Sequence, residues 1–226
     1  MNICILGDSV AKGIIYDESI GKYTFAKNSF YNIISKDKNL IVKNYAKFGC
    51  TVKKGIEILN RKFDSLKDYK YTVLEFGGND CDFLWPEVAA NPKDTHLSKV
   101  PTDKFVAYYE NMLSKIQELG STPIILTLPP IDSDRFFNWV SKGLNKNNIM
   151  NFLGNDVEFI YRWHESYNKA IISLAEKTNT PFIDITNEFI STNDYKSYLC
   201  VDGIHPNEKG HLLIANAILK KANGYI

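Results

Sequence analysis

The strongest constraint on the fold is an alternation of short apolar runs with longer segments of helical periodicity. Five runs rich in β-branched residues are bounded by Gly, Asn or Pro, a pattern that predicts strands. They are 2–6 (NICIL), 40–45 (LIVKNY), 71–76 (YTVLEF), 123–128 (PIILTL) and 181–185 (PFIDI). Between them, apolar residues recur three and four positions apart, as on the buried face of a helix. The clearest helical segments are 52–63, 105–119 and 160–174.

This order predicts the fold class. Strands joined by crossover helices must run parallel, and right-handed crossovers place helices on both faces of the sheet. We therefore expect an α/β protein, a three-layer α/β/α sandwich around a five-stranded parallel sheet. Thr102 is expected to cap one helix, and Pro206 is expected in the first turn of the last helix.

The length and charge of the chain limit the number of domains and the kinds of partner that it can have. A chain of 226 residues, 44% of them apolar, can bury one sizeable core, so we expect a single domain over 1–226. Two segments, at about 81–101 and 129–159, exceed what five strands and their helices need and are expected as insertions near the active-site edge. With 27 basic and 26 acidic residues there is no net field to attract nucleic acid or a membrane. No signal peptide or membrane span is visible, which predicts a cytoplasmic protein, although a trimmed secreted form would look the same.

Polar residues follow the predicted strands at the points where each strand ends. They are Gly7-Asp8-Ser9, Ala46-Lys47-Phe48-Gly49, Gly77-Gly78-Asn79-Asp80 and, further along, Asp202-Gly203-Ile204-His205. Each piece alone is a common turn sequence. Because active sites of open parallel sheets lie at the carboxyl ends of the strands, the four pieces are expected to converge.

Three of these residues have the chemistry of an activated nucleophile. A serine hydroxyl needs a base to take its proton, and the base needs a third group to orient its ring. Ser9, His205 and Asp202 can supply these roles, and an oxyanion hole can form from the N–H groups of Ser9 and Gly49 and the side-chain amide of Asn79. Gly49 suits this role because it lacks a Cβ. Asp202 favours the imidazolium form, so activity should rise with pH as His205 loses its proton.

The four motifs together resemble the SGNH (GDSL-type) hydrolase family over nearly the whole chain. The resemblance implies a flavodoxin-like α/β/α fold of five parallel strands and esterase or deacylase chemistry. It also implies Ser9 as nucleophile, Asp202 and His205 as the rest of a catalytic triad, and Ser9, Gly49 and Asn79 as the oxyanion hole. Here the fourth letter of the GDSL string is Val rather than Leu, and that position needs only an apolar side chain.

The second insertion and the helix after it are rich in aromatic residues. Seven of the 28 residues from Phe136 to Trp163 are aromatic, against 13% of the whole chain. Aromatic faces suit sugar rings and short acyl chains. The expected substrate-binding residues are Phe83, Trp85, Trp139, Trp163 and His164. The alternative is that these rings bury the insertion itself or cover a homodimer contact.

No cofactor or metal is predicted. Cys4, Cys50, Cys81 and Cys200 lack the close spacing of a zinc or redox motif and are expected to be free and buried; a metal site of the last three with His205 is the alternative. The predicted function is hydrolysis of a small acyl ester, such as an O-acetyl group on a carbohydrate or related metabolite. Acyltransferase or thioesterase chemistry is an alternative, as is a non-catalytic flavin, nucleotide or glycan binding module. The first turn lacks the GxGxxG and GxxxxGK[ST] phosphate loops, which argues against nucleotide binding.

Overall fold

A five-stranded parallel sheet forms the centre of the protein in the computed structural model, which describes residues 1–223. The strand order is β4-β1-β5-β6-β7. This is the flavodoxin-like order, in which the second strand of the sheet along the chain lies outside the first. The strands are β1 (Asn2–Gly7), β4 (Ile41–Asn44), β5 (Tyr71–Glu75), β6 (Thr122–Leu126) and β7 (Phe182–Ile183). The predicted fold class is confirmed, and all five strands lie within one or two residues of the predicted runs.

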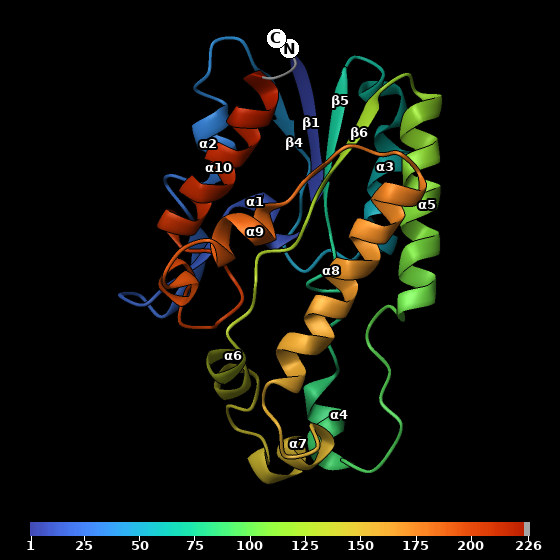
Figure 1. Ribbon diagram of the computed structural model, residues 1–226. Coiled ribbons are helices and arrows are strands. Elements are labelled where there is room, and N and C mark those ends of the chain that lie inside the picture. Colours follow the sequence, from blue (N-terminus) through green and yellow to red (C-terminus); the bar gives the residue numbers. More distant parts are fainter. Residues whose placement is uncertain (224–226) are drawn as a thin grey trace.

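Helices cover both faces of the sheet (Figure 1). On one face are α1 (Ser9–Lys12), α2 (Phe30–Ile34), α9 (Ile185–Ile190) and α10 (Glu208–Asn223); on the other are α3 (Val52–Leu66), α5 (Thr102–Glu118) and α8 (Phe159–Lys177). Each face has its own apolar core, and Phe30 and Phe189 are fully buried in one while Phe105 and Tyr109 are fully buried in the other. The sheet is therefore sealed on both sides, and its carboxyl edge is left for the polar turns.

Two helix starts differ from the predictions. Pro101, not Thr102, is the N-cap of α5, and Thr102 is the first residue of the helix. Pro206 does not lie in the first turn of α10: it pairs with Leu199 in an isolated β-bridge. Asn207 then accepts hydrogen bonds from the N–H groups of Lys209 and Gly210, so its side chain caps the start of α10.

A β-hairpin between β1 and α2 was not predicted. Its strands are β2 (Ile14–Asp17) and β3 (Lys22–Phe25), which pair antiparallel with each other and form a separate two-stranded sheet. Most of its side chains are partly or fully exposed. The hairpin follows directly after α1 and so lies close to the carboxyl end of β1.

The two expected insertions hold short helices that pack on one another. They are α4 (Trp85–Ala90), α6 (Ser133–Val140) and α7 (Lys146–Phe152), and η1 (Tyr195–Tyr198) precedes the last motif. Figure 1 shows α4, α6 and α7 beyond the carboxyl edge of the sheet, next to the first turns of α8. They share a third apolar cluster that includes Phe83, Trp85, Phe136 and Leu153. No helix among residues 1–223 is long and apolar enough to cross a membrane.

Candidate active site

Ser9, His205 and Asp202 form a continuous line of hydrogen bonds at the carboxyl edge. Ser9 Oγ lies 2.9 Å from His205 Nε2, and His205 Nδ1 lies 2.6 Å from Asp202 Oδ2. All three residues are buried, with Asp202 fully inaccessible and His205 7% exposed. With Nδ1–H donated to the carboxylate, Nε2 is free to accept the serine proton, which is the arrangement that activates a hydroxyl for attack.

The short turn between Asp202 and His205 is fixed by its own backbone contacts. Asp202 Oδ1 accepts hydrogen bonds from the N–H groups of Ile204 and His205, both at 3.1 Å. Gly203 has φ +76°, a conformation that suits glycine. The carbonyl of Gly203 also accepts the N–H of Asp132, which ties the turn to the segment before α6. Asp202 and His205 are only three residues apart, and the turn between them lets the carboxylate reach Nδ1 of the ring.

Hydrogen bonds and the neighbouring His205 stabilise the ionised form of the Asp202 carboxyl. Burial alone would raise the pKa of its carboxyl, but the hydrogen bonds from His205 and Ile204 and the charge of His205 outweigh burial and lower the pKa below its usual value. The carboxylate is thus ionised at neutral pH and can hold the ring of His205 in one tautomer.

The expected oxyanion residues line the same cavity as Ser9. This cavity has an empty volume of about 470 Å³ including its mouth, and its lining includes Ser9, Gly49, Asn79 and His205. Gly49 has φ +67°, whereas a Cβ built on it would meet no atom within 4 Å. The backbone conformation, rather than crowding within the chain, therefore explains the glycine. The Asn79 side chain is held by a hydrogen bond of 2.8 Å from its Nδ2 to Asp8 Oδ2.

A pair of buried carboxyl groups under Ser9 was not recognised in the sequence. Asp8 and Glu75 are 2% and 1% exposed and are hydrogen-bonded to each other. Burial, followed by the nearby charge of Asp8, raises the pKa of Glu75 well above its usual value. We place the shared proton on Glu75, which leaves Asp8 as a carboxylate. Asp8 then accepts from the N–H of Val10 and from Asn79, both at 2.8 Å.

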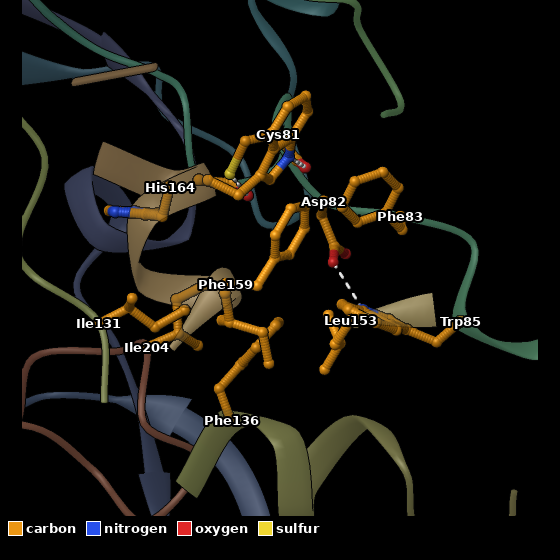
Figure 2. A pocket seen from close by; sticks show the side chains of 13 residues that line it. Cys81, Asp82, Phe83, Trp85, Ile131, Phe136, Leu153, Phe159, His164 and Ile204 are labelled. Atoms are coloured by element: carbon orange, nitrogen blue, oxygen red, sulfur yellow. Dashed lines mark hydrogen bonds between the residues drawn. The ribbon is translucent and has the colours of Figure 1, made fainter. Parts of the chain in front are cut away.

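A second, apolar pocket shares part of its lining with the cavity at Ser9. Figure 2 shows the side chains that line this second pocket. Its empty volume is about 330 Å³, and Gly78, His164 and Ile204 line both cavities. The remaining lining residues are Cys81, Asp82, Phe83, Trp85, Ile131, Phe136, Leu153, Phe159, Ile160 and Trp163. The carboxylate of Asp82 accepts a hydrogen bond of 2.8 Å from the indole N–H of Trp85 and forms an ion pair with Lys99 Nζ at 2.7 Å. The pocket therefore offers a surface for uncharged groups.

Four of the five expected substrate-binding residues line this pocket, and the fifth lies elsewhere. Phe83, Trp85, Trp163 and His164 are in its lining. Burial lowers the pKa of His164 to about 4, so its ring is neutral at the wall between the cavities. Trp139 packs instead on the hairpin, with its ring centroid 4.6 Å from that of Tyr16. The rings of Phe83, Trp85 and Trp163 line a pocket and also pack in the apolar cluster of the insertions, so their binding of substrate stays a prediction.

The cysteines are free and buried, and burial raises the pKa of each. Within residues 1–223, no cluster of three or more His, Cys, Asp or Glu side chains could hold a metal ion. The alternative metal site of Cys50, Cys81, Cys200 and His205 is therefore not formed.

The fold and the Ser-His-Asp geometry define a serine hydrolase of the flavodoxin-like α/β class. The chain belongs to the GDSL-like Lipase/Acylhydrolase family, which it matches over residues 5–213, and it is a GDSL-type ester hydrolase. This confirms the family resemblance carried by the sequence motifs.

Individual relatives are distant but cover the chain almost completely. A GDSL esterase/lipase of Arabidopsis thaliana is 20% identical over 229 residues, covering 96% of this chain and 80% of the relative. The crystal structure of a lipase/acylhydrolase from Enterococcus faecalis is 19% identical, with a TM-score of 0.69 over 100% of this chain and 97% of that one. A catalytic mutant of an acetylxylan esterase from Geobacillus stearothermophilus is 18% identical, with a TM-score of 0.62 over 97% and 92% of the two chains. At these identities the solved structures show a shared fold.

Proposed function

We propose that the protein hydrolyses a small acyl ester through an acyl-enzyme formed on Ser9. The observation that carries this proposal is the line of hydrogen bonds from Ser9 Oγ through His205 to Asp202, which ends in a cavity lined by Gly49 and Asn79. A buried serine hydroxyl that is hydrogen-bonded to an imidazole oriented by a carboxylate is the arrangement of an activated nucleophile.

The reaction follows from this geometry in two halves. Ser9 Oγ attacks the ester carbonyl while its proton passes to His205 Nε2, and the negative charge on the carbonyl oxygen is met by the N–H groups of Ser9 and Gly49 and by Asn79 Nδ2. His205 returns the proton to the leaving alcohol, which leaves an acyl group on Ser9. A water molecule then attacks the acyl-enzyme with His205 again as base, and the acid and free Ser9 are formed.

The proposed substrate is an O-acetyl group on a carbohydrate or a related metabolite. Phe48 lines the cavity at Ser9 with its ring stacked beside that of His205, and the Tyr23 ring also packs next to His205. Aromatic faces stack on the apolar faces of sugar rings. A relative of similar fold is an acetylxylan esterase, which agrees with the same substrate class.

The test is hydrolysis of p-nitrophenyl acetate, butyrate and octanoate by the wild type and by Ser9→Ala. We expect the acetate to be the best of the three and Ser9→Ala to lose activity by at least about 10³-fold. Ser98→Ala is the matched control, because Ser98 is also buried but its hydroxyl bonds Tyr167 at 2.6 Å rather than a histidine. This control should keep the wild-type rate.

A fluorophosphonate probe gives an independent readout that needs no knowledge of the substrate. It should modify one residue, Ser9, as located by peptide mass spectrometry, and the modification should be absent in Ser9→Ala. An unlabelled wild type, or a Ser9→Ala variant that keeps its esterase rate, would refute the mechanism. Acetylated xylooligosaccharides and other acetylated sugars form the next substrate panel.

A further inference from the structure

The β2–β3 hairpin brings a tyrosine hydroxyl to the carboxylate of the triad. Tyr23, on β3, lies with its Oη 3.1 Å from Asp202 Oδ2, across 179 residues of sequence. The hairpin pairs with no strand of the five-stranded sheet, so its position depends on side-chain contacts of this kind. The same carboxylate oxygen accepts the bond from His205 Nδ1.

Tyr23 fills the last acceptor site of Asp202. An ionised carboxylate has about four lone-pair sites for hydrogen bonds. Oδ1 accepts the N–H groups of Ile204 and His205, and Oδ2 accepts His205 Nδ1 and the Tyr23 hydroxyl. Asp202 is fully inaccessible, so no bulk water is at hand to replace a missing donor. Three of the four donors come from the turn that contains Asp202, and only Tyr23 comes from another part of the chain.

The chemistry of the pair fixes which group donates. Burial, followed by the charge of Asp202, raises the pKa of Tyr23, so its hydroxyl keeps its proton over the working range of an esterase. The ionised carboxylate can only accept. The Tyr23 O–H is therefore the donor, and it withdraws electron density from the oxygen that orients His205.

We propose that Tyr23 is a positioning residue of the catalytic triad, whose hydroxyl moderates the charge of Asp202 and thereby sets the pH at which His205 becomes a free base. This proposal rests on the proposed function, in which His205 is the general base. A donor on Asp202 weakens the pull of the carboxylate on the Nδ1 proton, so His205 loses its added proton at a lower pH than it would without Tyr23.

Packing holds the ring of Tyr23 in the orientation that this bond needs. The centroid of its ring lies 5.3 Å from that of Tyr16, 5.4 Å from Phe48, 6.1 Å from Trp139 and 5.2 Å from His205. These contacts order the ring although 38% of Tyr23 is exposed, so formation of the bond to Asp202 costs little further side-chain freedom.

Other titratable groups also act on the Tyr23, Asp202 and His205 cluster. Asp8 and His211 interact electrostatically with His205. Cys200 interacts with both Asp202 and Tyr23. The same cysteine feels the charges of Glu18 and Arg135. None of these groups accepts or donates a hydrogen bond at Asp202 Oδ2 among the described residues. The Tyr23 hydroxyl also accepts a hydrogen bond from the indole of Trp139, so removing it takes one donor from Asp202 Oδ2 and one acceptor from Trp139.

The first test is the pH profile of kcat/KM for Tyr23→Phe with p-nitrophenyl acetate. This variant keeps the ring and its packing and removes only the hydroxyl. The acid limb of the profile should move to higher pH by about half a unit or more, a threefold change in proton affinity. Tyr16→Phe is the matched control: Tyr16 pairs with Tyr23 across the hairpin and contacts the same Trp139 ring, but it has no bond to Asp202. Its profile should overlay that of the wild type.

The second test measures His205 directly and needs no substrate. The imidazole proton uptake of His205 is followed by NMR in wild type and Tyr23→Phe, with the signal assigned from its loss in His205→Gln. Movement of the titration to higher pH in Tyr23→Phe supports the proposal even if p-nitrophenyl esters are not substrates. The NMR experiment therefore tests the role of Tyr23 separately from the proposed esterase function. A lower melting temperature with unmoved titration and unmoved profile would show a structural role only, and it would overturn the proposal, as would a shift toward lower pH.

Discussion

Replacing Asp8 by Asn is expected to disable the proposed oxyanion hole while leaving the triad intact. Asp8 accepts hydrogen bonds of 2.8 Å from the N–H of Val10 and from Asn79 Nδ2. Bonds to a charged acceptor contribute about 1.5–3 kcal/mol each. An asparagine offers one acceptor oxygen in place of two, and Val10 is fixed at the start of α1. The amide oxygen must therefore face Val10, and its NH₂ group meets the NH₂ of Asn79.

The Asn79 amide then turns away from the orientation that donates to the substrate oxygen. Loss of one oxyanion donor costs about 10²–10³ in kcat, or about 2.7–4 kcal/mol of transition-state stabilisation. KM should change little, because the lost interaction is made mainly in the transition state. Initial rates with p-nitrophenyl acetate, together with thermal melting to show that the variant is folded, measure both quantities.

A double-mutant cycle tests whether Asp8 acts on the reaction through Asn79. If Asp8 acts through Asn79, the combination of Asp8→Asn with Asn79→Ala should be no slower than Asn79→Ala alone. The reasoning fails if Asp8→Asn keeps kcat within threefold of wild type. It also fails if the two losses simply add, since Asp8 would then act on the reaction by another route.

Two further predictions concern stability. Burial, with the charge of Asp8, raises the pKa of Asp80 to about 7, while a hydrogen bond from the N–H of Val52 opposes the rise. Between about pH 4 and 7 the native state therefore binds a proton that the unfolded state releases. The stability that this proton contributes is fully present below about pH 4 and is lost as the pH rises toward 7. The free energy of unfolding lost over this range is on the order of 4 kcal/mol. Asp80→Asn keeps the acceptor for Val52 and cannot ionise, so between pH 4 and 7.5 its stability, measured by urea unfolding, should rise relative to wild type. If the difference in free energy of unfolding between the two proteins does not change with pH, the raised pKa of Asp80 is contradicted. Gly203→Ala should destabilise by about 3 kcal/mol or more, because φ is +76° and a Cβ would lie 2.7 Å from the backbone of Asp132. Gly120→Ala is its control, with φ +77° and no atom within 4 Å of the added Cβ, and equal losses of melting temperature in the two variants would refute the steric argument.

The sheet and the four polar turns could be predicted because each follows from local pattern. Buried parallel strands read as apolar runs, and the residues after them must meet at one edge whatever the helices do. The distances between Ser9, His205 and Asp202 could not be predicted, because they depend on how the last turn docks on the segment before α6.

The hairpin was missed although its sequence contains a usable signal. GIIYDESIGKYTF has two runs of β-branched and aromatic residues with Gly21 between them, which is a hairpin pattern. The runs lack clean alternation because the hairpin is partly exposed on both faces, and this weakened the pattern. Its role at Asp202 is a tertiary contact that no local pattern reveals.

Glu75 and Trp139 show two other limits of prediction from the sequence. Glu75 lies in YTVLEF, and a charged residue in an otherwise apolar central strand is itself a signal of a buried partner, here Asp8. Trp139 was assigned to the substrate because its segment is rich in aromatic residues. Composition cannot say toward which neighbour a ring on a short helix points, and this ring packs on the hairpin.

The bond between Ser9 and His205 joins residues 196 positions apart. Closing a loop of that length comes with an entropy cost that must be met by contacts formed before it. Hydrolytic activity therefore cannot appear in a partly folded chain, and during refolding it should lag behind the signals of helix formation and of burial of the sheet. The rate at which activity returns reports the docking of the His205 turn, so the catalytic assay doubles as a probe of the final step of folding.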